Sequence, residues 1–179
     1  MSLKDDFTDD EWFLLSSVPA MIGSAMSTAA PSGVVGTVKE LSVGMRATVE
    51  GRSEHPDSAL IGELLERAAN WDETKAKAKD YRERTKARLE GAGVKDREAL
   101  HELVLADCRE AARLVDERCT ASDASAYRRW CVDIARKVAE AAKEGSFLGI
   151  GGVRVSDEER AMMGRIEAAL GVEGGVLVA

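Results

Sequence analysis

The chain has no charged residue between Trp12 and Val38, although nearly a third of all its residues are Asp, Glu, Lys or Arg. A membrane-spanning helix needs about 20 consecutive, mostly apolar residues. This run is broken at Pro19 and at Pro31-Ser32-Gly33, and it contains several serine and threonine hydroxyls. The missing charge therefore predicts two helices of small residues that are buried in protein, and it argues against a membrane span.

Cysteine is scarce, and its pattern fits neither a disulfide framework nor a metal site. Cys108, Cys119 and Cys131 are odd in number and lie far from the CxxC spacing of zinc sites. The N-terminus also lacks the apolar segment and the small-residue cleavage site of a signal peptide. We therefore expect reduced, mostly buried thiols in a cytoplasmic protein.

A net basic charge is also lacking. The net charge of −7 and the pI near 5.0 argue against a general nucleic-acid binder, which needs a basic face to neutralise phosphates. Residues 75–88 form the one locally basic segment, but Asp80 and Glu83 are interleaved in it. This mixture is typical of a solvated helix face, so we predict no nucleic-acid partner and no membrane partner. Whether the basic helix at 72–90 binds anything else stays open.

What the chain does contain is a series of helix signals. Thr8-Asp9-Asp10-Glu11 and Ser156-Asp157-Glu158-Glu159 both match the capping box, so a helix should begin at each. Pro19 has no amide hydrogen, and we expect it to kink or restart the first helix before residues 20–29. His55-Pro56-Asp57 and Gly91-Ala92-Gly93 are expected to separate later helices.

Further helices are expected at 33–50, from 59 to about 90, from Asp96, and from Ser122 or Asp123. Gly23, Gly36 and Gly44 favour a close approach of helix backbones. After Trp71 the helix expected from 59 to about 90 should continue as a thin seam that projects or lies on the surface. The apolar stripes are Val34, Val38, Leu41 and Met45; Leu60, Ile61, Leu64, Leu65 and Ala68; Leu100, Leu103, Val104, Ala111, Leu114 and Val115; Tyr127, Trp130, Cys131, Ile134 and Val138; and Met162, Met163, Ile166 and Leu170.

These patterns predict an all-α, single-domain bundle of six or seven helices. At 179 residues, such a domain is large enough to fold without metal or disulfides. The predicted domain covers residues 8–171, preceded by a disordered segment at 1–7 and followed by a flexible or docked apolar tail at 172–179. The small-residue helices and the seam at 71–85 are compatible with a homodimer.

Candidate chemistry is sparse. Glu98 and His101 form an ExxH element, as in di-iron bundles, but a second ExxH is lacking because His55 precedes a proline in an expected loop. Cys108 lies two turns from His101, which would suit a nucleophile pair, yet its neighbours form an apolar stripe typical of core. No catalytic residue and no cofactor is therefore predicted.

A glycine-rich loop at 145–152 precedes the last expected helix. It matches neither of the phosphate-binding glycine motifs, and the acidic residues after Ser156 would repel a phosphate. Phe147, Leu148 and Ile150 are apolar residues among the glycines. They either plug the core or form a partner-binding surface.

Two resemblances accompany these patterns. The segment from Arg128 to Gly145, with Glu11-Trp12 and Pro31-Ser32-Gly33, resembles uncharacterised bacterial helical proteins, a family that implies a fold but no activity. The last third is similar to tellurite-resistance TerB-like domains, on Ser156 and Glu159. That similarity implies a metal-binding role for nearby acidic residues. Gly151-Gly152, however, stands where the family has an acidic Asp-Gly pair.

The sequence therefore favours a non-enzymatic cytosolic module with an interaction or regulatory role, and a role in stress is one such function. Its contact surface is expected at Phe147, Leu148 and Ile150. The alternative is a helical protein that binds a metal or a small molecule through carboxylates on facing helices. Its candidate ligands are Glu98, His101, Asp157 and Glu158.

Overall fold

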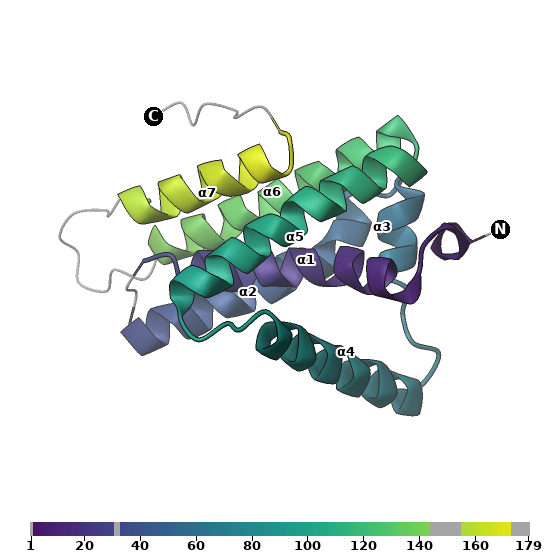
Figure 1. Cartoon of the computed structure of the whole chain (residues 1–179), viewed down its shortest axis with the longest axis horizontal. Helices are drawn as coiled ribbons and strands as arrows, with labels where there is room; N and C mark the ends of the chain where they lie inside the picture. The colour runs from purple at the N-terminus through teal and green to yellow at the C-terminus, as the bar shows by residue number, and fades with distance from the viewer. Residues whose placement is uncertain (1, 31–32, 144–154, 173–179) are drawn as a thin grey trace.

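The computed structural model describes residues 2–30, 33–143 and 155–172, without the side chains of 33–38, 142 and 143. This part of the chain contains seven α-helices, one 3-10 turn and no strand, which confirms the all-α bundle (Figure 1). The elements are η1 (Leu3–Asp6), α1 (Asp9–Ser27), α2 (Gly33–Glu54), α3 (Ala59–Leu64), α4 (Trp71–Gly91), α5 (Arg97–Arg118), α6 (Ala121–Lys143) and α7 (Asp157–Ala169). None of the described helices is long and apolar enough to cross a membrane.

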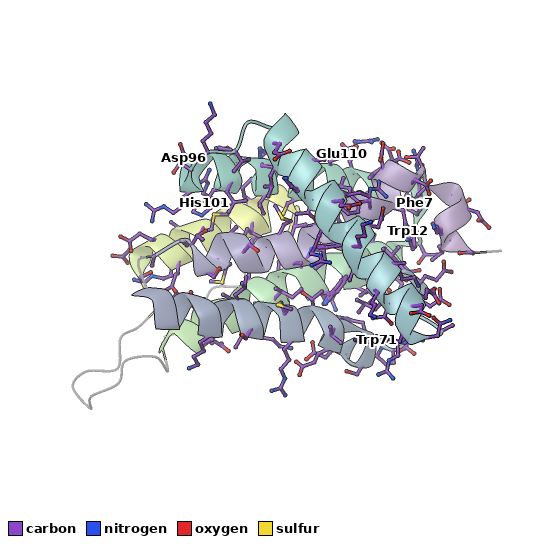
Figure 2. All side chains as sticks on the ribbon, turned by 90° about the horizontal axis from the view of Figure 1, so that it is seen from below. Phe7, Trp12, Trp71, Asp96, His101 and Glu110 are labelled. Carbon is purple, nitrogen blue, oxygen red and sulfur yellow. The ribbon has the colours of Figure 1, made fainter. Side chains whose placement is uncertain are left out.

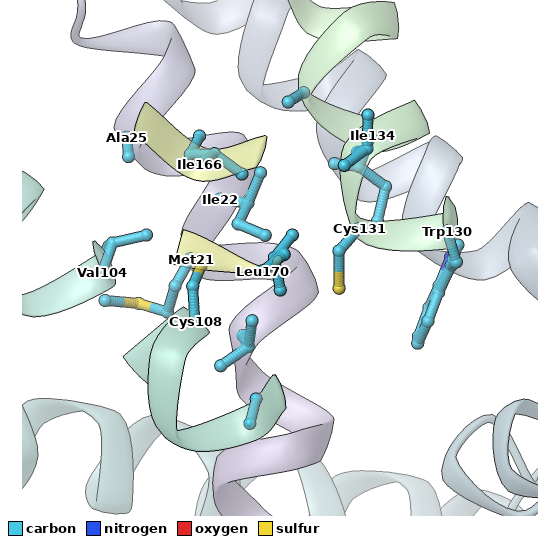
Figure 3. Packing of buried hydrophobic residues seen from close by; sticks show 14 of the residues in the cluster. Met21, Ile22, Ala25, Val104, Cys108, Trp130, Cys131, Ile134, Ile166 and Leu170 are labelled. Atoms are coloured by element: carbon cyan, nitrogen blue, oxygen red, sulfur yellow. The ribbon is translucent and has the colours of Figure 1, made fainter. Parts of the chain in front are cut away.

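Helix α1 is the centre of the bundle. It packs against α2, α5, α6 and α7 (Figure 1). Buried side chains of α5, α6 and α7 lie around those of α1 in Figure 3. Leu15, Val18, Ile22 and Ala25 are fully buried. A helix surrounded by protein has no water to solvate a charge, and this explains why α1 is uncharged after its first turn.

The first turn of α1 is fixed by the predicted capping box. The Thr8 hydroxyl accepts from the Glu11 amide, and the Glu11 carboxylate accepts from the Thr8 amide at 2.8 Å. Phe7 and Trp12, on either side of the box, have their ring centroids 5.7 Å apart, which is the hydrophobic staple. Arg118, in the last turn of α5, binds both oxygens of Glu11 and so ties α5 to the start of α1.

The expected kink at Pro19 is absent, because α1 runs unbroken from Asp9 to Ser27 with Pro19 inside it. Proline removes the amide that would bond the carbonyl of Leu15, four residues earlier. The Tyr127 hydroxyl of α6 donates to this carbonyl at 2.9 Å, and both residues are fully buried. A side chain from another helix thus supplies the hydrogen bond that the proline cannot make.

Close backbone contact holds α2 to the bundle, as the glycines of the sequence predicted. A Cβ atom on Gly23 would lie 3.3 Å from the Cα of Gly44, and one on Gly44 would lie 3.2 Å from the Cγ2 of Val138. Two turns further along α2, a Cβ on Gly51 would lie 2.2 Å from the indole nitrogen of Trp130. Glycine at these positions lets α2 touch both α1 and α6.

The single helix expected from residue 59 to about 90 is instead two helices. Helix α3 ends at Leu64, and α4 begins at Trp71 with Asn70 as its cap. The Asn70 side chain accepts from the Glu73 amide at 2.9 Å, and the Glu73 carboxylate accepts from the Ala69 amide at 2.7 Å. This local capping competes with continuation of the helix and ends it. The surface position expected for the second half is confirmed, since α4 has no buried residue.

The N-terminal end of the predicted domain and the start of one helix also differ in detail. Residues 1–7 were expected to be disordered, whereas Leu3–Asp6 form η1 and the Glu63 carboxylate accepts from the amides of Leu3 and Lys4. Helix α6 begins at Ala121, slightly before the expected Ser122 or Asp123. The apolar stripes predicted for α6 and α7 are confirmed as core: Tyr127, Trp130, Cys131, Ile134, Val138, Met162, Met163, Ile166 and Leu170 are all buried.

Tyr127→Phe tests the bond to the carbonyl of Leu15. The variant leaves a buried carbonyl without its donor, so we expect the free energy of unfolding to fall by about 1–3 kcal/mol in urea titrations. In a Pro19→Ala background the amide of the introduced alanine supplies the helical bond, and the same tyrosine change should cost clearly less. Equal costs in the two backgrounds would show that Tyr127 does not act through Leu15.

Gly51→Ala tests the contact between α2 and Trp130. Alanine raises helix propensity by about 1 kcal/mol, but its Cβ would overlap a buried indole. We expect a net loss of roughly 1–3 kcal/mol in the free energy of unfolding. Gly164→Ala in α7 is the control, because no atom lies within 4 Å of its added Cβ, and this variant should be neutral or more stable. A stabilised Gly51→Ala variant would contradict the packing.

Candidate functional site

Helix α4 is attached to the bundle by ionic and aromatic contacts rather than by burial. Arg84 donates to Asp10 at 2.7 Å, and its guanidinium lies over the ring of Phe13 at 4.2 Å. Arg88 donates from Nε to Asp107 at 2.9 Å, and the Asp107 side chain is only 2% exposed. The inner basic residues of α4 are therefore engaged with carboxylates of α1 and α5.

The outer basic residues of α4 and the clefts beside it are open to solvent. Lys79 and Lys86 stand 3.8 and 3.7 Å from Glu83 and Glu90, which fits the mixed, solvated face that the sequence predicted. A cleft of about 370 Å³ separates α4 from α1 and α3. Three aromatic side chains line it, together with charges of both signs: Trp12, Phe13, Tyr81, Asp9, Glu63, Glu66, Asp80, Lys4, Lys77 and Arg84.

The predicted candidates Glu98, His101 and Glu158 meet in one small pocket of about 210 Å³ between α1, α5 and α7. This is the arrangement of carboxylates on facing helices that the alternative function requires. Arg97 and Arg165 line the same pocket. With two arginines beside two glutamates, the pocket has no surplus of negative charge to attract a cation.

His101 is held by the protein itself. It is 6% exposed, and its Nε2 lies 3.1 Å from the Thr28 hydroxyl oxygen. That hydroxyl lies 3.0 Å from the carbonyl of Ser24, so it donates there and accepts from the imidazole. Burial lowers the pKa of His101, and the positive charges of Arg97 and Arg165 add to this effect, while the negative charge of Glu98 opposes it. The geometry describes a neutral histidine that joins α5 to the C-terminal end of α1.

Within residues 2–30, 33–143 and 155–172, no group of three or more His, Cys, Asp or Glu side chains is placed to hold a metal ion. Asp157, the remaining candidate, is paired with Arg160 on the next turn of α7. Ser156 accepts from the Glu159 amide, so these residues serve as a capping box. Figure 2 places His101 on α5 among the side chains of the bundle.

The positions of the cysteines confirm the prediction of mostly buried thiols. Cys108 and Cys131 are buried, and Cys119 is partly exposed. Burial raises the pKa of the Cys108 thiol to about 12 and that of Cys119 to about 11. A nucleophilic cysteine needs the opposite shift, toward the thiolate. Cys108 is thus a core residue, as predicted.

The predicted partner surface at Phe147, Leu148 and Ile150 lies outside the described residues. A different apolar surface is present on α2. Leu41, Met45 and Val49 are 40%, 63% and 70% exposed. They follow one another at intervals of four residues and so form one stripe along α2, which we call the α2 stripe. Helix α2 runs along one edge of the molecule in Figure 2.

The charges around the α2 stripe are not evenly mixed. Arg46, with a side chain 80% exposed, borders the stripe next to Met45, and Arg52 lies on the stripe's side two turns beyond Met45. Glu50 is shared between two cations: one carboxylate oxygen accepts from Arg46 at 2.6 Å, and the other accepts from Lys137 of α6 at 3.4 Å. Glu54 accepts from Lys137 at 2.5 Å. The stripe is therefore bordered by Arg52 and by Arg46, which Glu50 partly balances, in a protein of net charge −7.

The sequence pattern singled out Leu41 and Met45 of this surface, but neither Val49 nor the exposure of the stripe. Leu41 and Met45 belong to an apolar stripe at helical spacing, which is ordinarily the buried face of a helix. The structure buries the opposite side of α2, with Gly44, Ala47 and Gly51. The signal that could have revealed this was the row of small residues at positions 44, 47 and 51, which marks a second face.

Comparison with known proteins gives no family. A scan against models of protein families, a search of curated proteins and a search of solved structures each find no match.

His101→Gln tests the buried imidazole through pH. Because the pKa of His101 is lower in the folded state than its ordinary value of 6.5, the unfolded chain binds the proton first. The free energy of unfolding should fall as the pH drops below about 6.5, by at most about 1.4 kcal/mol per pH unit from this group. Urea titrations between about pH 5 and 8 should give a shallower decline for His101→Gln. If the free energy of unfolding changes with pH equally in the wild type and in His101→Gln, the proton is taken up by a group other than His101.

Proposed function

We propose that this protein is an interaction module and that it docks a helix of another protein on the α2 stripe. The single observation that carries the proposal is the exposure of Leu41, Met45 and Val49 in one row. Large apolar side chains that are scattered singly over a surface need no explanation, but a contiguous row of them favours a binding role.

The form of the α2 stripe supports a helical partner. Residues at intervals of four make a ridge that packs into the groove of a second helix. Recognition of an amphipathic helix uses apolar anchors at such spacing. Ser42 and Thr48 lie beside the ridge, and small side chains there leave room for a facing helix.

The proposal keeps the class of function that the sequence favoured, with the cytosol as its setting, and bases it on another surface. Phe147, Leu148 and Ile150 were expected to bind the partner, whereas the α2 stripe is argued from observed exposure. The other candidate, binding through carboxylates on facing helices, is less supported, because Arg97 and Arg165 balance the charge of that pocket.

Photo-crosslinking tests the docking role. With p-benzoylphenylalanine in place of Val49, irradiation of the producing cells should give an adduct with another protein, and Met45→Asp in the same chain should remove it. Lys79, 70% exposed on α4, is the control position and should not give that adduct. The captured protein, once purified, should bind the wild type and not Met45→Asp. An adduct that Met45→Asp leaves intact, or none at position 49, would contradict the proposal.

A further inference from the structure

Building on the proposed docking role, we infer that the partner is an amphipathic helix whose apolar face is bordered by Asp or Glu side chains. The protein carries a net charge of −7, yet two arginines border the α2 stripe: Arg52, and Arg46, whose Nε is paired with Glu50. A partner with acidic borders therefore meets opposite charge at this face, although the net charge of the whole molecule is negative.

The two arginines retain the capacity to bind a partner. Arg46 donates from Nε to Glu50 at 2.6 Å, and a guanidinium has five donors, so its terminal nitrogens remain for a second carboxylate. Arg52 contacts the carbonyls of Gly62 and Leu65 only at 3.4 Å. Both side chains are exposed, and an incoming carboxylate does not have to displace a strong internal ion pair from Arg52.

The positions of the arginines set the register of such a partner. Arg46 lies to the side of the α2 stripe, and Arg52 lies beyond its C-terminal end. A helix packed along Leu41, Met45 and Val49 brings its flanking residues toward Arg46 and one of its ends toward Arg52. Packing between ridges of this kind crosses the helices at about −50°.

The same features disfavour the other occupants of the stripe. In a second copy of this chain docked through α2, each face would present Arg46 and Arg52 to the same two arginines, and the carboxylate beside them, Glu50, is already shared between Arg46 and Lys137. An anionic membrane also attracts arginines, but a helix that lies in a membrane surface needs a wide apolar face with many basic residues. The α2 stripe is a single row flanked by Ser42 and Thr48.

The test uses two synthetic amphipathic helices with the same leucine face, one with Glu at the flanking positions and one with Lys there. Fluorescence anisotropy with the full chain should give roughly tenfold tighter binding of the Glu peptide, as expected for two exposed ion pairs gained rather than opposed. Arg46→Glu together with Arg52→Glu should reverse the preference. Met45→Asp should abolish binding of both peptides, and circular dichroism checks that each variant is folded.

The other outcomes separate this inference from the proposed function. Equal binding of the two peptides, lost in Met45→Asp, overturns the acidic partner and leaves the docking role in place. No binding of either peptide overturns the inference, while crosslinking at Val49 decides the docking role by itself. Binding to phosphatidylserine vesicles that Met45→Asp removes, or a dimer in sedimentation that it dissociates, assigns the stripe to a membrane or to a second copy and overturns the inference.

Discussion

The contact between the backbones of α1 and α2 at Gly23 and Gly44 is the constraint on which the other features of the structure depend. Two helices that touch through glycine must turn their small residues inward, and α2 repeats this at Gly51, against Trp130. Once that side of α2 is inside, the larger Leu41 and Met45 are outside. The exposure of the α2 stripe is thus a consequence of tight packing on the other side of the same helix.

Helix α1 can occupy the centre because its polar groups are satisfied internally. The hydroxyls of Ser17 and Ser27 donate to carbonyls of the preceding turn, and Tyr127 donates to the carbonyl that Pro19 leaves free. Burial raises the pKa of Tyr127, so its hydroxyl stays protonated and remains a donor. Helix α1, with Pro19 inside it, therefore depends on Tyr127 of α6 for its stability in the interior.

Local signals in the sequence were sufficient where the structure depends on local interactions. Both capping boxes and the stripes of α6 and α7 follow from residues three or four apart. The unbroken α1 did not, because Tyr127 is distant from Pro19 in the sequence. The prediction of which side of α2 is buried was also wrong, since this depends on which side of the helix fits α1 and α6 most closely. The candidate site was missed for the same reason, because an apolar stripe at helical spacing looks the same in the sequence whether it is buried or exposed.

The arginines of α4 and α2 have different roles, and the contrast bears on function. Arg84 and Arg88 lie over α1 and α5, where Asp10 and Asp107 neutralise them, so their charge holds the protein together. Arg46 pairs with Glu50, which it shares with Lys137, and Arg52 makes only long contacts to carbonyls. Arg52 and the terminal nitrogens of Arg46 lie beside apolar side chains that the fold does not bury, and an acidic and apolar surface of a partner would contact both.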